Sequence, residues 1–312
     1  MDNLILTLLS ISNVGKKSIH YFIEEMKNMP QNENDIVDIL INLKLNHRWI
    51  VIPKLEDVKI AREKAESIIV NSQKQNINAI DILSENFPEN LKDIQNAPAM
   101  IFYKGNYDSI INKDCVAVIG SRRADEKGLN GAYKLGEILS RQNYNVVSGL
   151  ALGCDSMAHK GCLHTGGTTV AVMPCSLDNI YPKENYNLAE DILNNNGCLL
   201  SEYALGHTIF KNNFIERDRI QSGLSLATIV VQSDVNSGTM HTVEFAIEQN
   251  RILACLDRNY SLNRNIIDRN KGIIINESYD ISSINRKIEE YKNKSEKNLK
   301  EINNSKQIKF IE

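Results

Sequence analysis

Residues 115–175 constrain the fold more than any other stretch of the chain. They contain three short apolar, β-branched runs that each end in a turn of small residues, and two of these turns lead into helix-like stretches. The runs are 116–119, 146–147 and 170–173, and the helical stretches are 128–142 and 153–164. Short apolar strands that alternate with helices are typical of a parallel sheet covered on both faces. The pattern predicts an α/β fold with a doubly wound, mostly parallel sheet.

The turns after the first two strands indicate a phosphate-binding edge. Both lie at the carboxyl edge of the predicted sheet, where open α/β folds bind ligands. Small residues let backbone N–H groups approach an anion, and two arginines add charge and bidentate donors. The candidate residues are Gly120, Ser121, Arg122, Arg123, Ser148, Gly149 and Gly153. The alternative is that the glycines serve turn geometry alone and that Arg122 is a surface or helix-capping charge.

Composition limits the classes of protein that fit. The chain has 312 residues, enough for one large domain and one or two small ones, and a net charge of −3. Any nucleic-acid site must therefore be a local patch. Six cysteines without a C-x-x-C pair indicate reduced thiols. With no leader-like N-terminus and no apolar run of membrane-spanning length, we expect a cytoplasmic protein with no membrane contact.

The first 74 residues predict a small helical domain. Apolar residues at helical spacing indicate a helix near 4–11, a second at 17–26, and two more at 34–45 and 55–74. The break at 12–15 gives the outline of a helix–hairpin–helix, whose turn can offer N–H groups to DNA phosphate. We favour a plain helical turn, because Asn13 stands where a second hairpin glycine is expected.

The rest of the chain divides into a core and a tail. Residues 75–112 read as a connector with a strand of its own, and the α/β domain as a whole covers 75–280. Further strands are expected at 198–200, 227–231, 251–256 and 272–275, with helices at 184–194 and 239–250. Residues 281–312 have helical spacing in a Lys/Glu-rich background, which predicts a solvated helix or a frayed tail.

Two catalytic or metal-binding alternatives come from the stretch after the second strand. Asp155 and His159 are four residues apart on a predicted helix, with Cys154 and Cys162 nearby, so a metal site is conceivable. No second ligand cluster is visible, and we favour a hydrogen bond or ion pair that shapes the loop. Ser148 as a nucleophile with His159 as base lacks a surrounding nucleophile-elbow motif.

Seven segments in order resemble the DprA/Smf family of bacterial DNA-processing proteins. They cover about residues 80–280, and none would be specific alone. The segments are FPENLKDIQNAPAMIFYKGN, VAVIGSRRA, SGLALGCDSMAH, GGTTVAVMPCSLDNIYPKEN, GCLLSEY, FIERDRIQSGLS and SGTMHTVEFAIEQNR. The resemblance implies an extended Rossmann-like fold, and the N-terminal helices fit the family's sterile-alpha-motif-like domain more loosely.

The resemblance also implies a function. Such a protein would bind single-stranded DNA, form a homodimer, and help load RecA onto incoming DNA in transformation, without catalysis, cofactor or metal. Helix 239–250 and strand 251–256 are candidates for the dimer interface. Further DNA-contacting candidates are Lys211 in the loop 204–213, Arg217, Arg219, Ser237 and Gly238. The aromatic residues that could stack on bases are Tyr181, Phe210 and Phe214.

The chain departs from the family pattern beside these arginines. Asp218 stands where the family has a neutral amide, and Glu216 adds another acid. Acids in a DNA groove would repel phosphate, so we expect weaker DNA binding and a gain from Asp218→Asn. The alternative is that Asp218 holds Arg217 or Arg219 in place. Residues 255–257 replace the family's valine-proline-glycine, and we expect no winged-helix domain after the core.

A second function class stays open. The wider Rossmann-like group includes lysine-decarboxylase-like phosphoribohydrolases, which process nucleotides. Ser237-Gly238-Thr239 followed by Glu244 is similar to that group's signature, although the spacing differs and the paired glycines are missing. A nucleotide-binding or nucleotide-processing protein is therefore the alternative to a DNA binder.

Overall fold

The computed structural model describes residues 3–294, and within them nine strands form one sheet. The strand order is β1-β2-β6-β5-β4-β3-β7-β8-β9. All neighbours pair in parallel except β1 with β2 and β2 with β6. The strands are β1 (Asn78–Asp81), β2 (Met100–Gly105), β3 (Cys115–Ile119), β4 (Asn145–Ser148), β5 (Thr169–Met173), β6 (Cys198–Ser201), β7 (Ala227–Val230), β8 (Ile252–Leu256) and β9 (Ile273–Ile275). The predicted doubly wound, mostly parallel α/β fold is confirmed.

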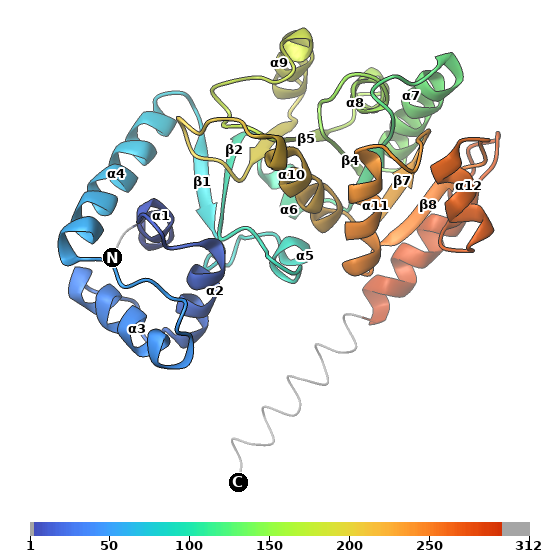
Figure 1. The fold of residues 1–312 in the computed structure, drawn as a ribbon. Coiled ribbons are helices and arrows are strands. Elements are labelled where there is room, and N and C mark those ends of the chain that lie inside the picture. Colours follow the sequence, from blue (N-terminus) through green and yellow to red (C-terminus); the bar gives the residue numbers. More distant parts are fainter. Residues whose placement is uncertain (1–2, 295–312) are drawn as a thin grey trace, which may run out of the picture.

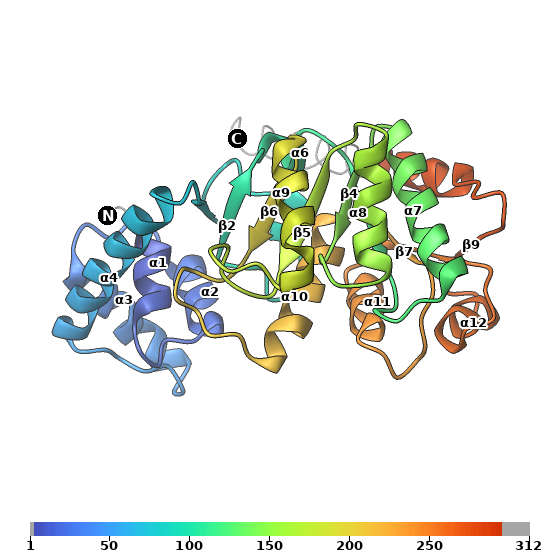
Figure 2. The ribbon, with the colours of Figure 1, turned by 90° about the horizontal axis from the view of Figure 1, so that it is seen from above.

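Helices cover both faces of the sheet because its central strands are apolar on both sides. Val116 and Val118 pack on one face and Ala117 on the other, and all three are fully buried. Figure 2 shows three helices side by side along the first face. These are α7 (Glu126–Arg141), α8 (Cys154–His164) and α9 (Tyr186–Asn194). The opposite face carries α10 (Lys211–Leu224), α11 (Thr239–Glu248) and α12 (Ser261–Asp268), with the short α5 (Glu89–Lys92) and α6 (Asp108–Ile111) beside them.

The N-terminal helices form a module beside β1 at one end of the sheet (Figure 1). They are α1 (Leu4–Ser10), α2 (Lys16–Glu25), α3 (Glu33–Asn46) and α4 (Leu55–Gln73), close to the predicted ranges. The module shares a hydrophobic core with the sheet: Phe22 and Leu8 belong to the same buried cluster as Phe102 of β2. Residues 11–15 form the turn between α1 and α2, with Asn13 in a left-handed conformation at φ 65°.

The C-terminal part of the sequence differs from the predicted tail. Residues 282–294 are helical, and Ile284 and Ile288 are fully buried in the same core as α7 and α8. Lys292 pairs with Asp114 at 2.9 Å, next to the start of β3. This helix therefore packs on the α/β domain, and the core extends beyond residue 280. Residues 295–312 of the predicted tail lie outside the described residues.

Glycines set the close approach of α7 and α8. A Cβ at Gly136 would lie 2.3 Å from the carbonyl oxygen of Ala158, and one at Gly161 would lie 1.9 Å from that of Tyr133. Both obstacles are backbone atoms, which cannot move aside without displacing a helix. The two helices therefore require glycine at these positions.

We expect Gly136→Ala to destabilise the fold by about 1–3 kcal/mol, the usual cost of overpacking a core. Helix propensity acts in the opposite direction, since alanine favours a helix by about 1 kcal/mol over glycine. Thermal or urea unfolding would measure the change, with the exposed Asn130→Ala in the same helix as control. A variant more stable than wild type would contradict the close-packing argument.

Candidate functional site

Two turns meet at the carboxyl edge of the sheet, after β3 and β4. The Ser121 amide donates to the carbonyl of Gln232 at 2.7 Å, and the Cys154 amide donates to the carbonyl of Ser121 at 3.2 Å. Gly153 has a φ of +82°, and a Cβ there would lie 2.3 Å from the Ser121 carbonyl oxygen. Gly120 is equally confined, because its Cβ would lie 2.6 Å from the Cys154 sulfur. These two glycines are needed for the packing of the two turns on each other.

Arg217 of α10 lies inside this edge, with only 4% of its surface exposed. Its Nη1 donates to the carbonyls of Gly149 at 2.5 Å and Val172 at 2.8 Å. A Cβ at residue 149 would lie 2.0 Å from the same nitrogen, so glycine leaves the room that the guanidinium occupies. Arg217 thus ties α10 to the ends of β4 and β5, and it also lines a cavity beside Arg122 and Phe214.

Two carboxylates lie beside Arg217. Asp155 accepts from the amides of Gly149 at 3.1 Å and Ala151 at 3.4 Å, so it shapes the loop after β4, as the favoured sequence interpretation held. Burial raises the pKa of Asp155, and the Arg217 charge opposes that rise. Asp218 accepts from Nε of Arg217 at 3.0 Å, and burial raises its pKa to about 6.

The prediction that Asp218 repels DNA requires its carboxylate to line a DNA groove, and the structure does not place it there. The Asp218 side chain lies against Arg217 inside the molecule, so it does not line a groove. Arg219 is likewise 3% exposed. Its Nη2 lies 2.7 Å from both carboxylate oxygens of Glu202, and its Nε donates to Glu216 at 3.3 Å. Both arginines are therefore held mainly by internal partners, and Arg217 also lines a small cavity beside Arg122 and Phe214.

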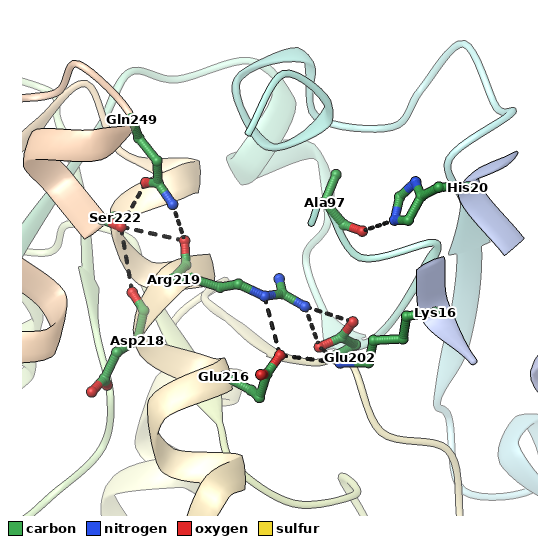
Figure 3. Close-up of polar contacts among 9 residues, drawn as sticks. All are labelled: Lys16, His20, Ala97, Glu202, Glu216, Asp218, Arg219, Ser222 and Gln249. Atoms are coloured by element: carbon green, nitrogen blue, oxygen red, sulfur yellow. Dashed lines mark hydrogen bonds and ion pairs between the residues drawn. The ribbon is translucent and has the colours of Figure 1, made fainter. Parts of the chain in front are cut away.

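Figure 3 shows that Lys16 of the helical module completes this network. Its ammonium lies 3.0 Å from Glu202 and 3.2 Å from Glu216, and the Arg219 charge reaches the same two carboxylates. Two cations therefore balance two anions at the junction of the module with α10. No local sequence pattern could predict the pairing of Lys16 with Glu202, because 186 residues separate them.

The exposed cations lie at the turn after β3. Arg122 and Arg123 are both exposed, and the Cζ of Arg122 lies 5.3 Å from the centre of the Phe214 ring. Phe214 meets Tyr181 edge to face at 5.4 Å. Arg122, Phe214 and Tyr181 border a cavity of about 120 Å³, whose other walls include Leu152, Pro174 and Arg217. A guanidinium, two aromatic rings and an apolar hollow suit a phosphate joined to a flat, apolar ring system.

The remaining predicted residues contribute differently. Ser148 is buried and donates to the carbonyl of Val118 at 2.7 Å, so its hydroxyl does not face the cavity. Lys211 is exposed at the start of α10, which begins two residues before the predicted loop end at residue 213. Ser237 donates to the carbonyl of Asp234 at 2.6 Å, and Gly238 precedes α11 with an ordinary helical φ of −58°. Both lie beyond β7, the neighbour of β3.

The catalytic and metal alternatives find no assembled site in this part of the molecule. His159 Nδ1 pairs with Thr169 Oγ1 at 2.7 Å, and burial lowers the pKa of His159 to about 3, which keeps the ring neutral. Within residues 3–294, no three His, Cys, Asp or Glu side chains are grouped as metal ligands. All six cysteines are buried thiols. No helix in the same range is long and apolar enough to cross a membrane.

We expect Asp218→Asn to gain stability relative to wild type as pH rises from about 4 to about 6.5. The unfolded aspartate loses its proton near pH 3.9, whereas the folded group, with its pKa at about 6, keeps it longer. Ionisation of the unfolded state alone lowers the free energy of unfolding across this interval. The relative gain should reach about 1–3 kcal/mol. Urea unfolding at several pH values would measure it, with the exposed Asp191→Asn as control. A gain independent of pH would contradict the assignment.

Comparison with known proteins adds independent evidence. Residues 78–290, more than half of the chain, match the family model of DNA recombination-mediator protein A. DNA processing protein DprA of Streptococcus pneumoniae is 38% identical over 177 residues, 57% of this chain and 62% of that protein. DprA of Bacillus subtilis is 34% identical over 188 residues, 60% of this chain and 63% of that protein. Protein Smf of Synechocystis is 30% identical over 234 residues, 68% and 58% of the two chains. The chain thus spans less than two thirds of each of these relatives.

Two solved structures share the fold. DprA from Streptococcus pneumoniae superposes with a TM-score of 0.73 at 27% identity, covering 88% of this chain and 94% of that one. DNA processing protein A from Helicobacter pylori gives 0.59 at 26% identity, covering 71% and 96%. The matched family model, the sequence relatives and the shared fold agree with the resemblance drawn from seven ordered segments. The chain belongs to the DprA/Smf family of DNA-processing proteins.

Proposed function

We propose that this protein binds single-stranded DNA at the carboxyl edge of its sheet and acts in DNA processing during transformation and recombination. The observation that carries the proposal is the placement of Arg122 beside Phe214 and Tyr181 at an open cavity. Single-strand binders combine cations that follow the phosphates with aromatic rings on which bases stack. The site offers both, with Arg122 from the turn after β3, Phe214 from α10 and Tyr181 from the segment between β5 and residue 183.

The local charge favours this role although the chain is acidic overall. Glu202 and Glu216 are already paired with Arg219 and Lys16, and Asp218 is buried against Arg217. The carboxylates near α10 therefore cancel charges inside the molecule. Arg122 and Arg123 keep exposed side chains toward solvent. A net charge of −3 for the whole chain is compatible with a cationic patch at this edge.

The relatives support the same chemistry. The Helicobacter pylori neighbour was solved for a unique single-stranded DNA binding mode, and the family model describes a recombination mediator. From this family we also propose that the DNA-bound protein helps load RecA. Omission of the protein should slow RecA assembly on oligo(dT) covered by a single-strand binding protein, as followed by RecA ATP hydrolysis.

We expect Arg122→Ala to bind oligo(dT) about 2- to 5-fold more weakly, on the scale of exposed charge interactions. A variant with one phosphate contact fewer releases fewer counterions when it binds, so the slope of log affinity against log salt should flatten by about 0.7. Fluorescence anisotropy over a salt series would measure both. Arg141→Ala removes an equal charge at the other end of α7 and serves as control. Unchanged affinity and slope would exclude Arg122, and binding of nucleoside monophosphates without oligo(dT) would favour the nucleotide-binding alternative.

We also propose a homodimer formed through the α/β domain. Strand 251–256 has no free backbone edge for a partner strand, because β8 lies between β7 and β9 and its backbone is paired on both sides. Helix α11 stays a candidate, since Ile247 on it is 41% exposed.

We expect light scattering at about tens of micromolar protomer to give a dimer mass, because self-association follows protomer concentration. Ile247→Glu should shift the mass toward the monomer if α11 forms the interface. Glu248→Gln, its exposed neighbour, is the control. A monomer mass for wild type would contradict dimerisation, and a dimeric Ile247→Glu would place the interface elsewhere.

A further inference from the structure

The helical module carries an aromatic cluster that the proposed site does not use. Tyr21 of α2 lies 4.2 Å from the His47 ring and 5.9 Å from that of Trp49, and His47 and Trp49 are 6.0 Å apart. The ammonium of Lys17 lies 5.9 Å from the Tyr21 ring centre and 5.2 Å from that of Trp49. Three rings and a cation thus meet on one surface, which we call the Trp49 cluster.

The cluster faces solvent. Trp49 is the only tryptophan of the chain and is 48% exposed, and Lys17 and Arg48 are exposed beside it. The core of the module is formed by other side chains, such as Ile5 and Phe22, which are fully buried. Tyr21 packs against this core, but packing does not explain the exposed ring of Trp49. Exposed rings with adjacent cations have the composition of a stacking platform for single-stranded nucleic acid.

The position of the cluster connects it with the proposed site. Lys17 follows Lys16, which contacts Glu202 and Glu216 at the junction with α10 (Figure 3). Beyond that junction, Tyr203 stacks on His207 at 4.2 Å, and His207 meets Phe210 edge to face at 6.1 Å.

Phe210 connects this second aromatic group with the cavity. Its side chain is 60% exposed, and it immediately precedes α10, whose next turn carries Phe214. Aromatic side chains therefore lie at the cavity, at the start of α10 and on the module.

The charges between the cavity and the Trp49 cluster favour phosphate binding at the end of α2 nearest the sheet. Lys16 and Arg219 neutralise the two carboxylates at the junction, so an approaching phosphate meets no unpaired acid among these four groups. On α2, Lys17 lies in the first turn and Glu24 and Glu25 in the last. Attraction for phosphate on this helix is therefore strongest where it adjoins α10.

We infer that a single strand bound at Arg122 continues past Phe210 onto the Trp49 cluster, where a base stacks on Trp49 and Lys17 pairs with phosphate. The inference extends the proposed function, on which it depends. The binding surface would then comprise both the carboxyl edge of the sheet and the helical module.

The single tryptophan gives a direct test. Oligo(dT) of about 6 nucleotides is near the lower limit of typical single-strand site sizes, and oligo(dT) of about 24 nucleotides exceeds the upper limit. We expect the long oligonucleotide to quench Trp49 fluorescence at saturation and the short one to leave it nearly unchanged. Anisotropy of labelled oligonucleotides reports binding separately. Saturation by the long oligonucleotide without any change in Trp49 emission would overturn the inference and leave the Arg122 site standing.

Variants of Trp49 and Lys17 distinguish base stacking on Trp49 from an indirect change in Trp49 fluorescence. Trp49→Ala should weaken binding of the long oligonucleotide about fivefold or more, and Trp49→Phe should restore most of it. Binding of the short one should stay within about twofold. Lys17→Ala should weaken binding of the long oligonucleotide, whereas Lys74→Ala, at the far end of α4, should not. Melting temperatures check the fold. If the wild type shows quenching but Trp49→Ala binds the long oligonucleotide as tightly as wild type, the inference is also overturned. Failure of the wild type to bind either oligonucleotide would overturn it together with the proposed function.

Discussion

The Arg217 guanidinium is the interaction on which the arrangement of the site depends. It donates to the carbonyls that end β4 and β5, and two buried carboxylates offset its charge. A buried cation without such partners would cost several kcal/mol. With them, it fixes where α10 lies against the sheet, and therefore where Phe214 lies relative to Arg122. A nearly buried side chain thus determines the geometry of the exposed site.

The side chains of helix α10 contact the sheet, the cavity and the helical module, and a different set of side chains serves each of them. Arg217 reaches the sheet carbonyls and lines the cavity together with Phe214. Glu216 and Arg219 point to the helical module. Successive residues of a helix are about 100° apart, so one short segment can serve all three. This explains why acids stand beside the arginines in this chain: each carboxylate has an internal cation as its partner, and the exposed arginines lie on another element.

The sequence predicted the parts of this arrangement that depend on local pattern. The apolar runs of β3 and β5 and the glycines at 120 and 153 follow from strand and turn chemistry. The direction of Arg217 and Arg219 could not be predicted, because α10 is polar on most sides and lacks an apolar stripe to orient it. The helix at 282–294 was expected to be solvated for a related reason. Its sequence is rich in Lys and Glu, and only two isoleucines of this helix are buried in the core.

The network of Lys16, Glu202, Glu216 and Arg219 makes the helical module and α10 one electrostatic unit. Removing any member leaves the network with an unbalanced charge, and the penalty is larger when the nearly buried Arg219 is lost than when the exposed Lys16 is lost. The asymmetry means that Glu202 is held chiefly by Arg219, whereas the module is held by the weaker, screened contact of Lys16 together with the shared hydrophobic core. Salt should therefore loosen the polar part of the junction without separating the module from the sheet.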